Sequence, residues 1–251
     1  MAISKKNLKI YFFLFFFFLL FYLIIKNLNS EKELITKPIS VNLLTSVHPD
    51  LSWNFKPLKS KIFSYVIVST EDKKIAKIAK ESGAEVPFMR PKYLATDNAT
   101  TTDVILHGIK KLEPMGYKFD VIVNLDVTVP FLRMKDVKGA VELLNKKKCD
   151  GVFGVYKQHL NPYYNIVEKD SKGFLKLVKP LKKRPTSRQS SPIVYQMNGL
   201  HIMRKDSIRK SETWYTPKIL PYEIPIETGL MIDTPFEFQI AKHMFKIFNN
   251  D

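Results

Sequence analysis

The chain has 251 residues, a length that allows one domain with a substantial core beside a shorter appended segment. Its 40 Lys and Arg against 24 Asp and Glu give a formal net charge of +16, which favours anionic partners without choosing among nucleotides, acidic sugars, nucleic acid and lipid head groups. The single cysteine, Cys149, excludes a disulfide within the chain, and the five histidines lack metal-ligand spacing, so zinc and thiol chemistry are not expected.

The first predicted element is an apolar run at residues 10–25, IYFFLFFFFLLFYLII, which follows three lysines. A helix of this length spans about 24 Å, slightly less than a bilayer core of about 30 Å. Three interpretations stay open for residues 1–26: a retained membrane anchor, a cleaved signal peptide, or a misread start of the coding sequence. A positive-inside anchor would place the rest of the chain outside the cytoplasm, whereas a misread start predicts a cytoplasmic protein.

After this run, residues 27–57 contain three prolines among polar residues and indicate a linker, which leaves a domain at 58–251. In that domain, short β-branched runs alternate with amphipathic stretches, the pattern of an α/β domain with helices packed on a mostly parallel sheet. The expected strands are 65–69, 121–125 at the centre of the sheet, and 151–155.

Apolar residues at helical spacing predict a helix that stops at Gly83, a helix that carries Val104, Ile105, Ile109 and Leu112, and a helix that carries Val137, Val141 and Leu144. A last helix is expected to begin after Thr234, where Thr234 and Glu237 flank Pro235 as a capping box. Its apolar face is expected to consist of Ile240, Met244 and Phe248.

Three charged residues stand where an α/β sheet commonly binds ligands, just after its strands. Asp126 follows the strand 121–125 and could hold a metal ion or accept a hydrogen bond from a substrate hydroxyl, or could be only a loop or capping residue. Asp233 precedes the last helix, where the helix dipole favours a carboxylate with or without a function. Arg90 lies between Pro87 and Pro91 and suits a phosphate or carboxylate, the alternative being a surface ion pair.

Two absences in the sequence narrow the function. Neither G-x-x-x-x-G-K-[ST] nor G-x-G-x-x-G occurs, so P-loop hydrolysis and a dinucleotide fingerprint are not supported. Aromatic residues do not interleave with the lysine runs in a repeated way, and nucleic-acid binding is therefore not expected.

Five segments follow one another in a recognisable order: LKSKIFSYVIVSTEDKKIAKIAKESGAEVPFMRPKYLATDNATTTDVILHGI, VIVNLDVTVP, NPYYNIVEKDSKGFLKLVKP, SRQSSPIVYQMNGLHIMRKD and YEIPIETGLMIDTPFEFQIAK. Together they resemble the acylneuraminate cytidylyltransferases, also called CMP-sialic acid synthetases, and their relatives for other nonulosonic acids. The resemblance implies a Rossmann-like nucleotidyltransferase fold. It also implies attack of a hydroxyl of an acidic nine-carbon sugar on the α-phosphate of CTP, with Mg²⁺ bridging the phosphates and pyrophosphate as the leaving group. A homodimer is one assembly that it leaves open.

The resemblance also implies roles for individual residues. Asp126 would face the substrate after the central strand, and Asp233 would be the second carboxylate of a D-x-D metal pair. The nucleotide side would include Arg90 and Thr101, with Asp97 shaping the loop between them. The sugar side would include the four residues Arg188, Gln189, Tyr195 and Asn198, where the arginine would pair with the sugar carboxylate.

The sequence departs from the family pattern at two important places. Met231 stands where the family has the first aspartate of the metal pair, and a thioether is a poor ligand for Mg²⁺. No Arg/Ser/Lys-rich phosphate loop occurs between residues 1 and 57, so the first βα unit is expected to be missing. Smaller shifts occur after the central strand, at Val129, Leu132 and Arg133. Two alternatives therefore accompany the enzyme: a non-catalytic or truncated relative, and a membrane-anchored glycosyltransferase or binding module, which would need a D-x-D motif that residues 126–128 do not supply.

Overall fold

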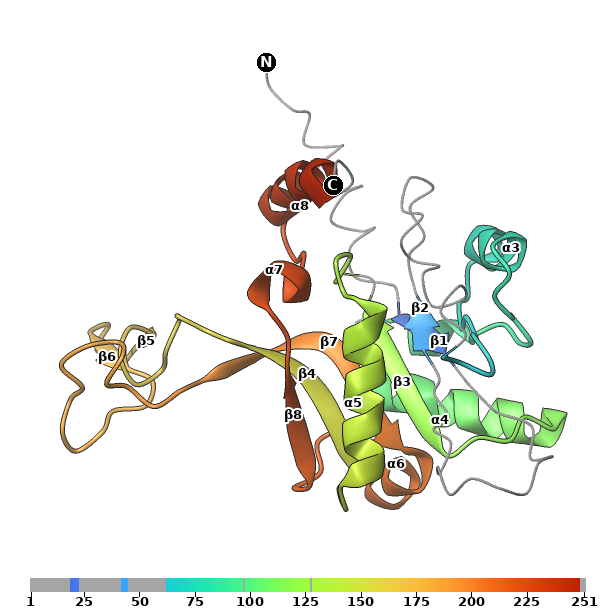
Figure 1. The fold of residues 1–251 in the computed structure, drawn as a ribbon, viewed down its shortest axis with the longest axis horizontal. Helices are drawn as coiled ribbons and strands as arrows, with labels where there is room; N and C mark the ends of the chain where they lie inside the picture. Colours follow the sequence, from blue (N-terminus) through green and yellow to red (C-terminus); the bar gives the residue numbers. More distant parts are fainter. Residues whose placement is uncertain (1–18, 23–41, 45–61, 97, 127, 249–251) are drawn as a thin grey trace.

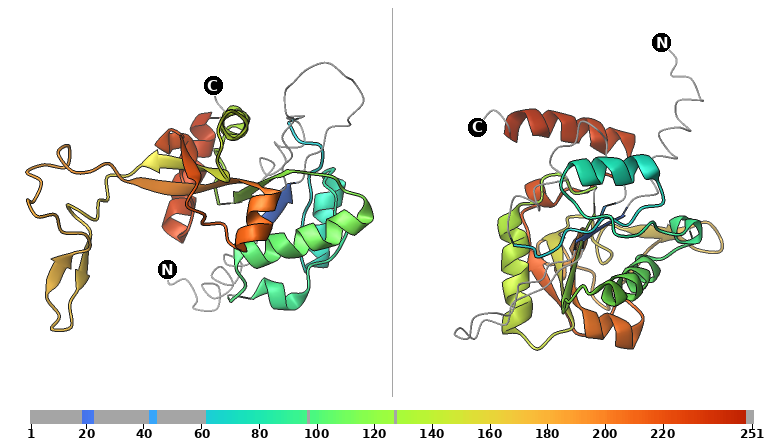
Figure 2. Two further views of the ribbon diagram at one scale, coloured as in Figure 1. Left: turned by 90° about the horizontal axis from the view of Figure 1, so that it is seen from below. Right: turned by 90° about the vertical axis from the view of Figure 1, so that its right-hand side faces the viewer.

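A mixed sheet with helices against it forms the centre of the computed structural model, which describes residues 19–22, 42–44, 62–96, 98–126 and 128–248. The six strands lie in the order β2 (Asn42–Leu44), β1 (Leu19–Tyr22), β3 (Val121–Asp126), β7 (Tyr195–Arg204), β4 (Gly151–Lys157) and β8 (Ile219–Glu223). Figure 2 shows α5 (Met134–Lys146) on one side of this sheet, and α4 (Thr101–Leu112) with α6 (Lys205–Ser211) on the other. The α/β architecture agrees with the prediction.

The prediction of a mostly parallel sheet is wrong for the strands described. Only β4 and β8 pair in parallel, whereas β3 with β7, β7 with β4, β1 with β3 and β1 with β2 pair antiparallel. The chain leaves β4 at Lys157 and enters β7 at Tyr195, directly opposite. Two paired strands whose connection leaves one and enters the other at the same edge of the sheet must run antiparallel. β7 therefore runs opposite to β4, and it also runs opposite to β3 on its other side.

Two of the three predicted strands lie in this sheet. β3 and β4 contain the segments 121–125 and 151–155, and β3 lies inside the sheet between β1 and β7. The segment 65–69 is buried but contributes only an isolated parallel bridge between Ile67 and Glu85. Hydrogen bonds from Val68 N to Glu85 O and from Glu85 N to Val66 O, each 2.8 Å long, hold this extended segment.

Part of the apolar run, for which a membrane anchor was one of three interpretations, lies in the sheet. Residues 19–22 form β1, whereas residues 10–18 and 23–25, together with the predicted linker apart from residues 42–44, lie outside the described residues. Within the described part of the chain, no helix combines the length and the apolar character that a bilayer crossing requires. The prediction of a missing first βα unit concerns mainly residues outside those described.

The predicted helices all form, although α4 and α5 begin three residues before their first predicted apolar residues and α5 also ends two residues later than predicted. α3 (Lys73–Glu81) is capped by the carboxylate of Asp72, which accepts a hydrogen bond from Lys74 N at 2.6 Å, and it ends before Gly83, whose φ of 93° is left-handed. α4 has a complete capping box between Thr100 and Asp103. The apolar faces of α4 and α5 pack into one core with β3, β7 and β4, in which the fully buried side chains include Ile105, Leu112, Ile122, Leu144 and Leu200.

The last helix, α8 (Pro235–Phe248), has the predicted capping box: Thr234 N donates to Glu237 Oε2 at 2.8 Å, and Glu237 N donates to Thr234 Oγ1 at 3.2 Å. Its packing face was predicted only in part. Met244 contacts the small cluster around Phe131 and Ile232 as expected, but the other contacts come from Phe238, Ala241 and Phe245, and Ile240 is 38% exposed. The side chain of Phe248 is outside the described ones.

An extended arm, residues 158–194, connects β4 to β7. It carries the two-stranded sheet of β5 (Val167–Lys169) and β6 (Leu175–Leu177) and projects away from the main sheet (Figure 1). The arm buries little apolar surface of its own. Seven of its apolar side chains are exposed: Leu160, Val167, Phe174, Leu175, Val178, Leu181 and Ile193.

Candidate active site

Asp126 ends β3 and has a fixed orientation. Asn124 lies two residues earlier on the same face of the strand, and its Nδ2 donates a hydrogen bond of 2.8 Å to Asp126 Oδ1. On the neighbouring strand β7, Gly199 has a φ of 77°, and a Cβ there would lie 2.8 Å from the Cβ of Asp126. Only glycine allows both this backbone conformation and this close approach.

Asp126 is partly buried where β3 pairs with β7. Burial raises the pKa of the Asp126 carboxyl, an effect that the charge of His201 and the hydrogen bond from Asn124 partly offset. His201 lies opposite Asn124 across the β3–β7 pair, and burial lowers its pKa despite the charge of Asp126. Its ring packs against Phe153, with ring centroids 4.7 Å apart. A cation brought to this carboxylate would be bound in a partly desolvated place, where its attraction is stronger than in open water.

Asp233 lies near the same end of β3. Ile232 N donates a hydrogen bond of 2.9 Å to Thr128 O, which joins the segment before α8 to the loop after β3. Partial burial, then the charges of Glu237 and Asp126, raise the pKa of Asp233. Tyr156 is buried beside this group, and its pKa is raised by burial and by the charges of Asp233 and Glu237. Mutually repelling carboxylates of this kind are relieved by a bound cation.

The donor set fits Mg²⁺ that is shared with a substrate better than a site built from protein alone. Within the described residues, no group of three or more His, Cys, Asp or Glu side chains has a metal-binding arrangement. Mg²⁺ usually takes one or two carboxylates and completes its shell with water and phosphate oxygens, which Asp126 and Asp233 can accommodate. Met231 does not replace the missing carboxylate, because its partly buried side chain packs against the hydrophobic core.

The predicted nucleotide-side residues are placed differently from one another. Arg90 is 5% exposed, and its Nη2 and Nε lie 2.5 and 3.2 Å from Glu71 Oε2. The guanidinium therefore forms an ion pair, as in the alternative interpretation, although the pair is more buried than a surface pair. Thr101 is the first residue of α4, at a helix end whose dipole favours anions. Asp97 lies outside the described residues.

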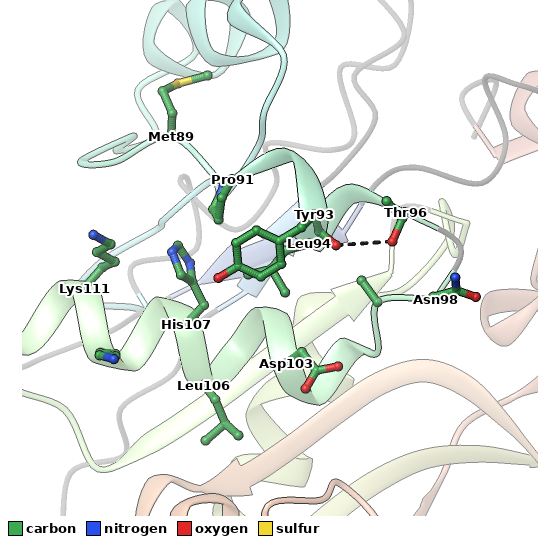
Figure 3. Close-up of a pocket in the computed structure, with 12 residues that line it drawn as sticks. Met89, Pro91, Tyr93, Leu94, Thr96, Asn98, Asp103, Leu106, His107 and Lys111 are labelled. Atoms are coloured by element: carbon green, nitrogen blue, oxygen red, sulfur yellow. Dashed lines mark hydrogen bonds between the residues drawn. The ribbon is translucent and has the colours of Figure 1, made fainter.

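The segment around Arg90 also borders a pocket with a volume of about 840 Å³, between α4 and the short 3₁₀ helix η2 (Lys92–Ala95) (Figure 3). Neither Arg90 nor Thr101 is among its twelve lining residues, which are Met89, Pro91, Tyr93, Leu94, Thr96, Asn98, Ala99, Asp103, Leu106, His107, Lys110 and Lys111. Asp126 and Asp233 are not among the lining residues either.

The four predicted sugar-side residues fall into two groups. Asn198 is fully buried in β7, next to Gly199, and within the described structure its Nδ2 has no hydrogen-bond partner. A Cβ at Gly229 in α7 (Ile226–Gly229) would lie 3.3 Å from that nitrogen. Tyr195 begins β7 and is 45% exposed, whereas Arg188 and Gln189 are exposed on the arm. The fold thus buries the Asn198 side chain between Gly154 and Gly229, but holds Arg188 and Gln189 outside the sheet.

Several residues around Asp126 escaped the sequence-based prediction. Asn124 interrupts the apolar run VIVNLD two residues before Asp126, and this spacing could have indicated that the two side chains share a face. No comparable pattern pointed to His201, Tyr156 or Gly199, because they reach the site only through the pairing of β7 and β4 with β3 and through the packing of the C-terminal segment.

The α/β sheet with an arm inserted between β4 and β7 has a nucleotidyltransferase-type fold, as the likeness to solved structures shows. In its fold, the chain is similar to the structure of CMP-2-keto-3-deoxy-manno-octonic acid synthetase complexed with CTP, with a TM-score of 0.56 over 80% of this chain and 88% of that one, at 15% sequence identity. The model of the cytidylyltransferase family matches residues 53–218. The chain belongs to the cytidylyltransferase family, as its ordered segments predicted.

Three named relatives show which kinds of protein the chain resembles in sequence. The chain is 35% identical to the pseudaminic acid cytidylyltransferase of Campylobacter jejuni over 201 residues, which cover 76% of this chain and 82% of that protein. It is 28% identical to the CMP-N,N'-diacetyllegionaminic acid synthase of Legionella pneumophila over 194 residues, 76% of this chain and 82% of the relative. It is also 28% identical to the post-translational flagellin modification protein B of Campylobacter coli over 189 residues, 74% and 79% of the two chains.

Proposed function

We propose that the protein transfers CMP from CTP to a hydroxyl of an acidic nine-carbon sugar of the sialic-acid type. In this reaction the sugar oxygen forms a bond to the α-phosphorus, the bond from that phosphorus to the bridging oxygen of pyrophosphate breaks, and the hydroxyl proton is lost. The observation that carries the proposal is the convergence of Asp126 and Asp233 at the end of β3, in a chain of the cytidylyltransferase family.

In this proposal the two carboxylates act on the phosphate side. They would hold Mg²⁺, which when bound neutralises phosphate charge and stabilises the charge that develops on the leaving group. Asp126 is positioned by Asn124 and Gly199 to accept a hydrogen bond from the attacking hydroxyl or to bind the cation. Arg188 and Gln189 would recognise the sugar carboxylate. Because CTP is a cytoplasmic substrate, the proposal also places the protein in the cytoplasm.

The test uses the full chain, since deletion of the apolar N-terminal segment would remove β1 from the sheet. Pyrophosphate release is measured with CTP, Mg²⁺ and, separately, pseudaminic, legionaminic and N-acetylneuraminic acid. We expect turnover with at least one sugar and loss of turnover without Mg²⁺ or in Asp126→Asn. A folded protein that binds CTP but turns over none of the three sugars would support the non-catalytic relative instead.

The proposal includes a homodimer formed through the arm. The arm exposes seven large apolar side chains, among them Phe174 at 69% and Leu175 at 68%, and a second copy of the chain would cover such a surface. Light scattering of the full chain is expected to give twice the monomer mass, and the double variant Phe174→Ser, Leu175→Ser is expected to give the monomer mass. Met115→Ser, which changes an exposed side chain of the body, is the control. A wild-type monomer would refute the dimer.

A further inference from the structure

The arm at residues 158–194 is held together by polar rather than apolar groups. Among the residues of the arm, all of which the structure describes, only Asn161 at 3% exposure and Ser191 at 8% are buried. Large apolar side chains of the arm, such as Phe174 and Leu175, are exposed instead. A buried asparagine is uncommon unless its polar atoms have hydrogen-bond partners. The arrangement of the arm therefore depends mainly on hydrogen bonds.

Each polar atom of Asn161 takes part in a hydrogen bond. Its side-chain Oδ1 accepts from Tyr163 N at 2.9 Å, and its Nδ2 donates to Pro192 O at 2.9 Å. Its backbone N donates to Asn165 Oδ1 at 2.6 Å, and its backbone O accepts from Ile166 N at 3.0 Å. Three of these bonds stay within the segment that leaves β4, whereas the bond to Pro192 crosses to the segment that returns to β7.

Pro192 comes directly after the turn that carries Arg188 and Gln189. Ser191 closes this turn, because its N donates to Arg188 O at 3.1 Å and its Oγ donates to Ser187 O at 3.1 Å. Ser191 is buried, and the ring of the next residue, Pro192, restricts the backbone further. The turn and Pro192 therefore form one constrained unit, and the hydrogen bond to Pro192 O ties this unit to the outgoing segment.

Other hydrogen bonds between the two segments lie nearer the sheet. Gln158, the first residue after β4, donates from its N to Val194 O at 3.0 Å and from its Nε2 to Gln196 Oε1 at 2.5 Å. These bonds continue the pairing of β4 with β7 and hold the root of the arm. Among the hydrogen bonds of the described residues, the bond from Asn161 to Pro192 joins the two segments closest to the turn.

We infer that Asn161 is a positioning residue for the sugar, because its side-chain amide holds the turn of Arg188 and Gln189 in place. The inference rests on the proposed function, in which those two residues recognise the sugar carboxylate. Only an amide suits this position, since its oxygen accepts from Tyr163 N while its nitrogen donates to Pro192 O. A carboxylate would keep the first bond but direct an oxygen toward Pro192 O, and the two oxygens would repel each other.

The test compares Asn161→Asp with Asn165→Asp in the full chain. Both substitutions replace an amide with a carboxylate in the same loop, so they change the net charge equally. Asn165→Asp keeps the oxygen that accepts from Asn161 N, and the donor that it loses bonds to His159 O, 3.2 Å away on the same segment. Asn165→Asp is therefore the matched control, because it leaves the bond between the two segments intact.

The measurements are the kinetics of pyrophosphate release and hydrogen–deuterium exchange of the segment 187–194. We expect Asn161→Asp to raise the KM for the sugar about tenfold, while kcat and the KM for CTP change less than about twofold. Amide exchange in 187–194 should become about tenfold faster. Asn165→Asp should change each quantity less than about twofold. Exchange in β3 should stay the same in all variants, which checks that the sheet is folded.

A double variant tests whether Asn161 acts through the turn. In the Arg188→Ala background, Asn161→Asp should raise the KM for the sugar less than about threefold further, because both substitutions disturb the same contact. A full tenfold rise in that background, equal effects of Asn161→Asp and Asn165→Asp, or faster exchange with an unchanged KM for the sugar would each overturn the inference. A wild-type protein that turns over no sugar would refute the proposed function instead, and the exchange rates would still show whether Asn161 holds the turn.

Discussion

The end of β3 and the arm at residues 158–194 both carry residues that the family resemblance assigns to one active site, yet the fold holds them in different ways. Asp126 is fixed by a hydrogen bond from Asn124 and by the close approach of Gly199, and Asn198, the residue before Gly199, is fully buried in β7. Arg188 and Gln189 are exposed on an arm that projects from the sheet (Figure 1). The phosphate-side residue Asp126 is therefore held in place by its neighbours in the sheet. The position of the sugar-side residues Arg188 and Gln189 depends instead on where the arm lies.

The largest effect should come from the rigid region. Asp126→Asn keeps the shape of the side chain and the hydrogen bond from Asn124 but removes the negative charge, so we expect pyrophosphate release to fall about 10²- to 10³-fold. Asp120→Asn is the matched control, because Asp120 is an exposed aspartate beside the opposite end of β3. If Asp126→Asn lowers the rate of pyrophosphate release less than about threefold, Asp126 is only a loop residue. The end of β3 would then not differ from the arm in its chemistry.

The next effect separates stability from nucleotide binding at Arg90. Glu71→Gln leaves the guanidinium of Arg90 buried without its charge partner, and we expect a loss of about 2–3 kcal/mol in the free energy of unfolding, measured by urea denaturation. Glu81→Gln, which breaks the exposed pair with Lys77, should cost at most about 0.5 kcal/mol. A weaker affinity for CTP in Glu71→Gln with unchanged stability would instead give Arg90 a role in nucleotide binding.

The arm should give a smaller effect that is confined to the sugar. Arg188→Ala is expected to raise the KM for the sugar about tenfold while the KM for CTP stays the same, because the guanidinium would pair with the sugar carboxylate alone. Arg184→Ala removes an equally exposed arginine from the same arm and should leave both constants unchanged. Equal effects of the two substitutions would mean that the arm acts only through its net charge, and the distinction between the two regions would lose its chemical basis.

Local patterns in the sequence were sufficient for the helices α3, α4, α5 and α8 and for the strands β3 and β4, but not for α6, α7, β7 or β8. The capping box at Thr234 and the apolar spacing of α4 and α5 depend on neighbours within a few residues, and they were predicted correctly. The capping box at Thr100 was found only in the structure. The direction of β7 was not predictable in this way, because it depends on an arm of some forty residues that returns the chain next to β4. The same limit explains why the segment 65–69, apolar as a strand should be, lies in a single bridge.

The candidate site shows the same division. Asp126 and Asp233 could be proposed from their positions after a strand and before a helix, and the structure brings them together through the contact of Ile232 with Thr128. The surroundings that tune them come from other strands: His201 from β7, Tyr156 from β4 and Gly199 from β7. Their identities were visible in the sequence, but their proximity to Asp126 follows only from strand register.

The smallest expected effect is on thermal stability. It would show that the carboxylate at the end of β3 destabilises the folded protein, whereas Arg188 on the arm does not. Burial raises the pKa of Asp126 above its ordinary value, so the folded protein holds this proton more tightly than the unfolded chain. Stability therefore falls as the pH rises from the ordinary pKa of about 3.9 to the raised one, and the penalty stays constant above it.

Asp126→Asn should unfold at a higher temperature than the wild type at pH 7 and lose this advantage near pH 3, where both forms are neutral. Arg188→Ala should show no such difference at either pH, because its exposed side chain is solvated in the folded and unfolded states. A stabilised but inactive Asp126→Asn would mean that the charge at the end of β3 is retained for chemistry at the expense of stability.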